Sequence, residues 1–255
     1  MIWGKDTPAL VTGGSSGLGA AVAKMLIAAG VPTGILDLNA ESGAAFAGET
    51  GVAFARCDVA DPSSVSEALT QLRNINGMER ICVNCAGIAP AARTVSRDAP
   101  HDPALFQKVI SVNLIGTFNV ASQSAAGMSR QAPVNADGER GVIINTASIA
   151  AFEGQIGQVA YAASKAAVAG MTLPMARDLA KAGIRVVAIA PGIFQTQMVS
   201  GFSEDVQEAL AKSAEFPRRL GRPDEYASLV RHVIDNTMIN GEVIRLDAAT
   251  RMATK

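Results

Sequence analysis

The amino-acid sequence predicts a single α/β domain over residues 1–255, with a doubly wound parallel sheet of seven strands and helices on both faces. Short apolar runs alternate with longer segments of helical period, as in repeated βαβ units. The runs at 9–12 and 142–146 are apolar throughout, as expected of strands covered on both faces. A chain of 255 residues, 49% of them hydrophobic, is long enough for one sizeable core.

The strands and helices follow in order along the chain. Strands are expected where short apolar runs end in turn residues, at 9–12, 34–38, 52–56, 81–84, 142–146, 185–190 and 243–246. Helices are expected where apolar residues recur at helical spacing, at 17–29, 62–73, 106–128, 159–181 and 223–235. The stretches 88–103 and 195–217 fit neither pattern.

Composition favours a small ligand. The net charge is −1 with scattered lysines and arginines, so no basic surface for nucleic acid or an anionic membrane is expected. Apolar stretches break before the roughly 20 residues needed to cross a bilayer. The first strand follows the N-terminus closely, which leaves no room for a targeting segment and predicts a cytoplasmic location. Cys57, Cys82 and Cys85 are interpreted as packing residues, with no metal site, because nothing nearby completes a ligand set.

A glycine-rich segment joins the first strand to the first helix. Gly13, Gly17 and Gly19 allow a tight turn and a close approach of backbone N–H groups to a pyrophosphate. The N-terminus of the following helix favours negative charge as well. A plain connection can also be rich in glycine, but the place between strand and helix indicates dinucleotide binding.

The second strand ends with an acidic residue. Asp37 follows Gly19 at close to the offset of roughly 20 residues expected of a group that binds the adenosine ribose. Its carboxylate would repel a 2′-phosphate, and no Arg or Lys adjoins it in the sequence, so NAD is predicted rather than NADP. The alternative is that Asp37 only caps the next helix.

Ser148, Tyr161 and Lys165 predict proton transfer at an alcohol or ketone oxygen. Tyr161 and Lys165 are four residues apart on a predicted helix and share one face. A phenol with a pKa of about 10 is a poor base at neutral pH, but an ammonium and a positive nicotinamide would both lower its pKa. Ser148 follows a strand and can donate a hydrogen bond to the substrate oxygen. Each residue alone is more often structural, and the combination favours catalysis.

Together these residues resemble the short-chain dehydrogenase/reductase family from end to end. The motifs are the segment 12–19, Asn84-Cys85-Ala86-Gly87, Asn113, Ser148, Tyr161-x-x-x-Lys165 and Pro191-Gly192. The resemblance implies a Rossmann-type fold and catalysis by Asn113, Ser148, Tyr161 and Lys165, with Asn113 kinking its helix to hold a proton-relay water. From the residues alone, Asn113 could be an ordinary polar helix residue.

The same resemblance implies a set of ligand contacts. Those to NAD are Gly13, Ser16, Gly17, Leu18, Gly19, Asp37, Asp58, Val59, Asn84, Cys85, Ala86, Gly87, Tyr161, Lys165, Pro191, Gly192, Phe194 and Thr196. Those to the substrate are Ser148, Gln155 and Tyr161.

Four segments, 141–148, 151–155, 170–174 and 240–247, are similar to the branch of type-2 3-hydroxyacyl-CoA dehydrogenases, which also oxidise hydroxysteroids. This likeness implies interconversion of 3-hydroxyacyl-CoA and 3-ketoacyl-CoA in fatty acid metabolism, by a bacterial relative because no targeting segment is seen. A hydroxysteroid or other lipophilic alcohol is the alternative substrate. A non-catalytic NAD-binding partner of a protein or RNA complex is the alternative of another class, against which the intact catalytic residues and the missing basic patch argue.

Two surface features bear on substrate and assembly. The stretch 195–217 has Met198, Val199, Phe202, Leu210 and Phe216 among polar residues, the pattern of a mobile amphipathic lid or of a surface helix packing its own apolar face. Arg218, Arg219 and Arg222 could meet a CoA phosphate, although such basic runs are usually solvated. Ala160, Ala163, Ala167 and Gly170 are small enough to admit another helix, and the family usually forms homotetramers.

Overall fold

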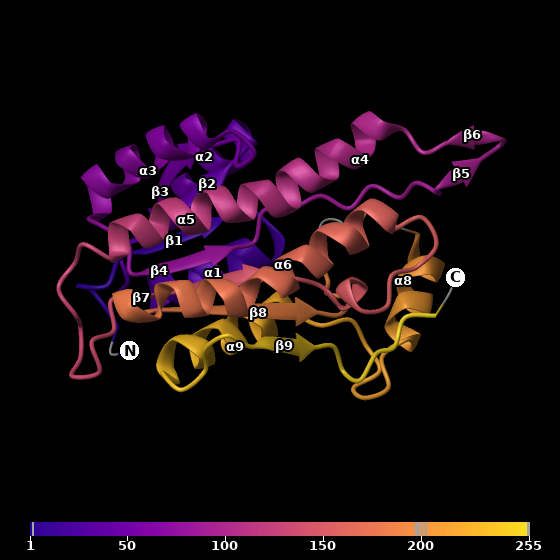
Figure 1. Ribbon diagram of the computed structural model, residues 1–255. Coiled ribbons are helices and arrows are strands. Elements are labelled where there is room, and N and C mark those ends of the chain that lie inside the picture. The colour runs from indigo at the N-terminus through magenta and orange to yellow at the C-terminus, as the bar shows by residue number, and fades with distance from the viewer. Residues whose placement is uncertain (2, 197–198, 200, 202, 254–255) are drawn as a thin grey trace.

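A computed structural model describes residues 1, 3–196, 199, 201 and 203–253. Its main sheet is parallel and has seven strands in the order β3-β2-β1-β4-β7-β8-β9 (Figure 1). The strands are β1 (Ala9–Thr12), β2 (Thr33–Asp37), β3 (Ala53–Arg56), β4 (Ile81–Asn84), β7 (Gly141–Thr146), β8 (Ile184–Pro191) and β9 (Val243–Leu246). The predicted fold class is confirmed, because every predicted strand is present in one doubly wound sheet.

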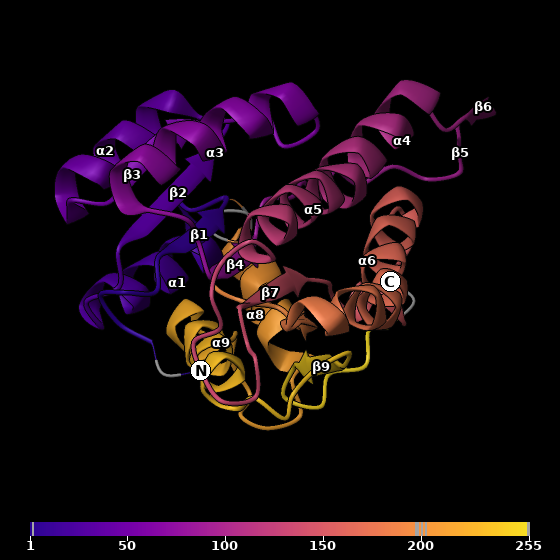
Figure 2. The ribbon, with the colours of Figure 1, turned by 60° about the vertical axis from the view of Figure 1, so that its left-hand side comes forward.

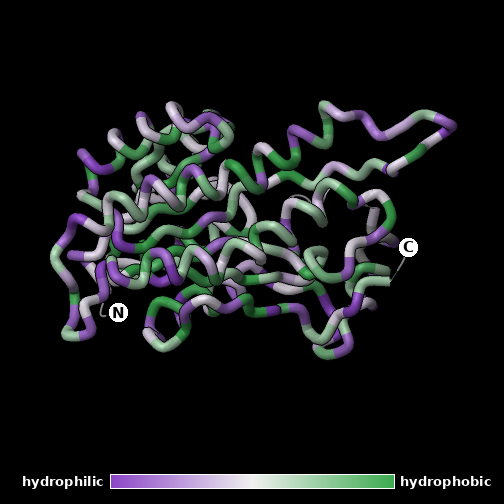
Figure 3. The backbone as a smooth tube through the Cα atoms, in the orientation of Figure 1, coloured by the Kyte–Doolittle hydropathy of each residue, from purple (hydrophilic) through white to green (hydrophobic). Residues whose placement is uncertain are grey.

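Helices cover both faces of this sheet (Figure 2). One face carries α1 (Gly17–Ala28), α2 (Ala40–Thr50) and α9 (Pro223–Asp235), and the other carries α3 (Pro62–Asn76), α5 (Thr117–Met128) and α6 (Val159–Leu179). Each face of the sheet has its own hydrophobic core. Within β1, Val11 packs into the core under α1, α2 and α9, and Leu10 packs into the core under α3, α5 and α6. Both side chains are buried, which explains why the strand is apolar on both faces up to Thr12. Hydropathy colouring shows the same apolar character along the central strands (Figure 3).

Helix α2 was not predicted from the sequence. It holds two glycines, and its one large apolar side chain, Phe46, gives little periodicity. The helix begins because the side chain of Asn39 accepts hydrogen bonds from the N–H groups of Glu41 and Ser42. It ends at Gly51, in the left-handed region with φ 74°. Asn39 therefore caps this helix, and the alternative role proposed for Asp37 is wrong.

The long helix predicted at 106–128 begins earlier, at Pro103, and is interrupted in the middle. It consists of α4 (Pro103–Ile110), the π-helical segment η1 (Ser111–Gly116) and α5. By length and apolar composition, Pro103–Met128 would suffice to cross a membrane, which the sequence analysis did not expect. Here it is a layer of the domain, with α5 packed against α3 and the sheet and α4 against α6.

The two unassigned stretches contain short elements. Residues 88–103 include a hairpin of β5 (Val95–Ser96) and β6 (Ala99–Pro100), which extends away from the sheet with hydrophilic residues at its tip (Figures 1 and 3). Residues 195–217 include the helix α8 (Glu204–Lys212), in agreement with the surface helix that was one of the two interpretations of this stretch.

Candidate active site

The turn between β1 and α1 has the backbone conformation that glycine permits. Gly13 and Gly17 have φ of 59° and 52°, in the left-handed region. A Cβ atom at Gly19 would overlap the carbonyl oxygen of Gly13, so no other residue fits there without moving the turn. Ser16 is the N-cap of α1 and leaves its side chain free of a capping hydrogen bond. The turn therefore keeps exposed backbone at a helix N-terminus, which suits a pyrophosphate.

Asp37 adjoins this turn at the end of β2. Its Oδ2 accepts a hydrogen bond from the Ser15 hydroxyl and one from the Ser15 N–H at 3.2 Å. Ser15 was missed in the sequence analysis, because nothing in the sequence pairs it with a residue on the next strand.

A positively charged side chain that is distant from Asp37 in the sequence lies on the neighbouring strand in the structure. Arg56 on β3 is the register partner of Asp37. Its Nε lies 3.4 Å from the carbonyl oxygen of Leu38, and its side chain is exposed. Asp37 lines the main cavity of the described chain, and Arg56 does not.

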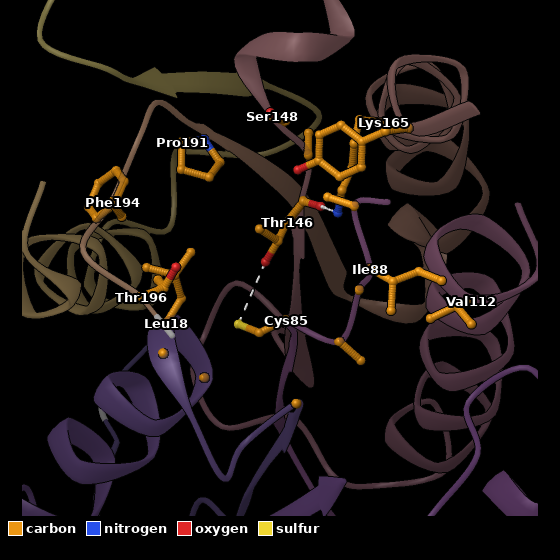
Figure 4. A pocket seen from close by; sticks show the side chains of 18 of the residues that line it. Leu18, Cys85, Ile88, Val112, Thr146, Ser148, Lys165, Pro191, Phe194 and Thr196 are labelled. Carbon is orange, nitrogen blue, oxygen red and sulfur yellow. Dashed lines mark hydrogen bonds between the residues drawn. The ribbon is translucent and has the colours of Figure 1, made fainter. Parts of the chain in front are cut away.

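Ser148, Tyr161 and Lys165 converge where β7 ends against α6. The Lys165 ammonium donates a hydrogen bond to the carbonyl oxygen of Thr146 at 2.7 Å and lies 5.8 Å from the centroid of the Tyr161 ring. The Ser148 side chain lies close enough to the Tyr161 hydroxyl to lower the pKa of that phenol. Figure 4 shows Ser148 and Lys165 on one side of the opening, across from Leu18 and Phe194. The three groups are thus brought together, as the sequence analysis expected.

Burial has the largest influence on the pKa values of Lys165 and Tyr161. It lowers the pKa of Lys165 to about 8, and the Lys165 side chain is almost fully buried. Burial raises the pKa of Tyr161, while the hydrogen bond from Ser148 acts in the opposite direction. The direction for Tyr161 is opposite to the lowering that was expected from the Lys165 ammonium together with a nicotinamide.

Asn113 lies at the centre of the π-helical segment and is fully buried. Its amide forms a reciprocal pair with the backbone of Ile88, with hydrogen bonds of 2.8 Å and 2.9 Å. It also donates to the Ser164 hydroxyl at 3.0 Å, and that hydroxyl donates to the carbonyl oxygen of Tyr161. Asn113 thus links its own helix to the loop after β4 and to α6. The π-helical segment is the irregularity that was expected in the helix at this residue.

The glycine turn, Asp37, Ser148, Tyr161 and Lys165 line a cavity of about 640 Å³, and Asn113 does not line it. Most of the predicted ligand contacts line it: Gly13, Ser16, Gly17, Leu18, Gly19, Asp37, Asp58, Val59, Cys85, Ala86, Gly87, Ser148, Tyr161, Lys165, Pro191, Gly192, Phe194 and Thr196. Asn84 and Gln155 do not line it, because their side chains bind Asn145 and the carbonyl oxygen of Ala253.

The cavity also includes residues that sequence reasoning missed. Lys108 comes from α4, Gln158 from the start of α6, and Met252 from the segment after β9. Gln158 lies within the region between Ser148 and Tyr161 and could have been considered. No local pattern marks Lys108 or Met252.

The stretch 195–217 is divided between two cavities. Val199 is buried and lines the main cavity, while Leu210 and Pro217 line a neighbouring one of about 250 Å³. Phe216 is 84% exposed. Met198 and Phe202, also named for this stretch, lie outside the described residues.

Two of the three arginines that follow this stretch, Arg219 and Arg222, form ion pairs. Arg219 pairs with Glu225 at 2.6 Å and Arg222 with Asp224 at 3.3 Å. These pairs favour a structural surface over a phosphate site.

The cysteines differ in their surroundings. Cys57 and Cys82 are buried, and burial raises the pKa of their thiols to about 11 and about 12. Cys57 and Cys85 both line the main cavity, and Cys85 accepts a hydrogen bond from the Thr146 hydroxyl at 3.6 Å (Figure 4). Within the described part of the chain, no three His, Cys, Asp or Glu residues gather as a metal site.

Comparison with known proteins places this fold and site in a family. Residues 7–207 match the short chain dehydrogenase family, and the chain belongs to that family. It is therefore an oxidoreductase of the class that uses a nicotinamide cofactor.

Similar proteins align along nearly the full length. The chain is 50% identical to 3-hydroxyacyl-CoA dehydrogenase type-2 of Drosophila melanogaster, over 97% of this chain and 98% of that one. It is 49% identical to the Homo sapiens protein of the same name, over 97% and 96%. A crystal structure of 3-hydroxyacyl-CoA dehydrogenase type-2 from Mycobacterium avium superposes with a TM-score of 0.93 at 43% identity, covering 98% and 97% of the two chains. Ipsdienol dehydrogenase of Ips pini is 34% identical, over 98% and 99%.

Proposed function

We propose that this protein interconverts 3-hydroxyacyl-CoA and 3-ketoacyl-CoA with NAD as cofactor. The observation that carries the proposal is the meeting of Ser148, Tyr161 and Lys165 at one end of a cavity whose other end is the glycine turn. Relatives about 50% identical along the whole chain carry the name 3-hydroxyacyl-CoA dehydrogenase type-2, which supports this substrate class.

Each residue has a role in the proposed reaction. Tyr161 donates a proton to the ketone oxygen, or accepts it from the alcohol. Lys165 holds positive charge near the phenol, and Ser148 hydrogen-bonds the substrate oxygen. Asn113 fixes the backbone of Ile88 and, through Ser164, that of Tyr161. The nicotinamide, when bound, exchanges the hydride with the substrate carbon.

The cavity fits a dinucleotide, and Asp37 supports NAD rather than NADP. Cavity residues of the glycine turn would hold the pyrophosphate, and Asp37 would accept hydrogen bonds from the ribose hydroxyls. The nearby Arg56 points its Nε at a backbone carbonyl and lies outside the cavity, so it does not offset the repulsion of a 2′-phosphate. Wild type should prefer NADH to NADPH in kcat/KM, and Asp37→Ser should weaken that preference. An unchanged preference in Asp37→Ser would contradict the assignment.

Lys108 offers a test of CoA as part of the substrate. Its exposed side chain lies on the cavity wall, where a cation can meet a CoA phosphate. Lys108→Ala should raise KM for acetoacetyl-CoA while leaving KM for the phosphate-free N-acetylcysteamine thioester unchanged. Lys24→Ala, which removes an exposed lysine on α1 that pairs with Glu49, is the control. If purified wild type leaves acetoacetyl-CoA unchanged with NADH, the acyl-CoA proposal is abandoned.

A lipophilic alcohol is the second candidate substrate. The relative named ipsdienol dehydrogenase aligns end to end, and Val199, Ile193 and Met252 give the cavity apolar walls. A panel of hydroxysteroids and other alcohols with NAD, followed by NADH absorbance, separates the two candidates. Such alcohols should be oxidised with lower kcat/KM than 3-hydroxybutyryl-CoA.

The chain is also proposed to form a homotetramer. Ile115, Phe118 and Leu173 are 44–50% exposed, and space around Gly170 is open. Ala160, named earlier for this contact, is buried within the subunit and is not available to a partner. Light scattering should give about four times the 26.2 kDa of one chain, and a mass near 26.2 kDa would contradict the proposal. The single domain with a lid at 195–217 and the cytoplasmic location remain predictions.

A further inference from the structure

The chain reverses direction after β9. Ala248 and Ala249 have φ of 50° and 60°, in the left-handed region that non-glycine residues seldom adopt. Asp247 holds this turn, since its carboxylate accepts from the N–H of Ala249 at 3.1 Å and its carbonyl accepts from Thr250 at 2.9 Å. Two residues in uncommon conformations indicate that the position of the segment 248–253 is imposed by its surroundings.

An ion pair holds this segment against the loop that follows Ser148. Arg245 on β9 donates two hydrogen bonds to the carboxylate of Glu153, at 2.7 Å and 3.3 Å. The same guanidinium binds Asp247 at 2.7 Å and the carbonyl oxygen of Thr250 at 3.0 Å. Its hydrogen bond to Glu153 lowers the pKa of that carboxyl. Glu153 and Arg245 are each only 24% exposed, so the pair is better shielded from water than an ordinary surface pair.

Glu153 also fixes the residue that reaches the cavity. Its second oxygen accepts a hydrogen bond from the N–H of Met252 at 3.2 Å. Gln155 donates to the carbonyl oxygen of the next residue, Ala253, at 3.2 Å. The backbone on both sides of the Met252 side chain is thereby tied to the loop between Ser148 and Tyr161.

Met252 lines the main cavity at its catalytic end. Ala150 and Gln158, which also line the cavity, belong to the same loop that holds Met252. The end of the cavity proposed for the adenosine ribose is at Asp37 on β2, which is separated from β7 by β1 and β4 in the sheet. Met252, in contrast, is tied to the loop that follows β7. Met252 is therefore placed to touch the substrate rather than the adenosine.

We propose that Met252 is a specificity-determining residue that contacts the acyl chain of the substrate, and that the Glu153–Arg245 pair positions it. The proposal rests on the proposed acyl-CoA function. The unbranched thioether side chain of methionine packs against an alkyl chain and has no strong hydrogen-bonding group that needs a partner, which suits this role. Its size sets how long or branched a chain fits beside the reacting carbon.

The test is a comparison of chain lengths. Met252→Ala should raise the ratio of kcat/KM for 3-ketodecanoyl-CoA to that for acetoacetyl-CoA by roughly tenfold, the scale of one or two methylene groups in an apolar pocket. Met252→Phe should shift the ratio in the opposite direction. Met238→Ala is the matched control, because Met238 is 91% exposed, and should leave the ratio unchanged. An unchanged ratio in both Met252 variants overturns the proposal, whereas an inactive wild type overturns the proposed function instead.

A double variant tests the positioning role. Glu153→Gln should shift the ratio in the direction of Met252→Ala, because the carboxylate then no longer holds the segment. If Glu153 acts through Met252, the double variant should show no further shift beyond Met252→Ala alone. Independent, multiplying shifts would mean that Glu153 acts on general stability, and would refute its positioning role.

Discussion

Replacing Asn113 tests whether the buried amide supports both the π-turn and the site. Asn113→Ala removes three hydrogen bonds of 2.8–3.0 Å from a fully buried position. Each contributes about 0.5–1.5 kcal/mol, and the unpaired backbone groups of Ile88 add a desolvation penalty of about 1–3 kcal/mol. We therefore expect a loss of about 3–5 kcal/mol in the free energy of unfolding. Urea unfolding followed by far-UV circular dichroism measures it, at fixed protein concentration because assembly would contribute to stability.

Asn119→Ala is the matched control for this experiment. Asn119 lies on α5, directly after the π-helical segment, is half-buried, and donates to the carbonyl oxygen of Val59 at 3.0 Å. Its loss should cost about 1 kcal/mol. Because both substitutions replace Asn with Ala in a helix, the propensity gain is common to them. If Asn113→Ala costs no more than Asn119→Ala, the structural role assigned to Asn113 is wrong.

Two further predictions concern the cofactor turn and the buried lysine. Gly19→Ala should weaken NADH binding, measured by fluorescence titration, by roughly tenfold or more, because its Cβ overlaps the oxygen of Gly13. Gly48→Ala, where a Cβ meets open space, is its control, and equal affinities would contradict the turn assignment. Burial lowers the pKa of Lys165 from 10.5 to about 8, so the unfolded chain binds more protons between these values and stability rises with pH across that window. The stability of wild type relative to Lys165→Met should therefore increase from about pH 7.5 to about pH 9.5, and a constant difference in urea unfolding would refute this.

The strands were predictable because their burial leaves a direct mark on the sequence. A central strand such as β4, with Ile81 and Val83 on one side and Cys82 on the other, carries apolar residues on both faces. Helix α2 was not predictable in this way, because it begins through a single side-chain cap and presents only Phe46 to the core. This helix therefore forms because of its N-terminal cap, although its apolar residues show little helical periodicity.

The same distinction holds for the site. Tyr161 and Lys165 are neighbours on one helix, so their spacing alone places them together. Contacts made across the sheet left no such trace, as with Ser15 and Asp37 or the register pairing of Asp37 with Arg56. Met252 is held at the cavity in part by an ion pair between residues 92 positions apart, Glu153 and Arg245, and this depends on the complete fold.

The proposal that Tyr161 transfers the proton is tested by measuring turnover and cofactor binding together in Tyr161→Phe. The phenyl ring keeps the shape of the half-buried side chain and removes only the hydroxyl that would carry the proton. We expect the variant to bind NADH with wild-type affinity and to lose roughly 10²- to 10⁴-fold in kcat with acetoacetyl-CoA. A variant that binds NADH and reduces acetoacetyl-CoA at the wild-type rate would contradict the proposal.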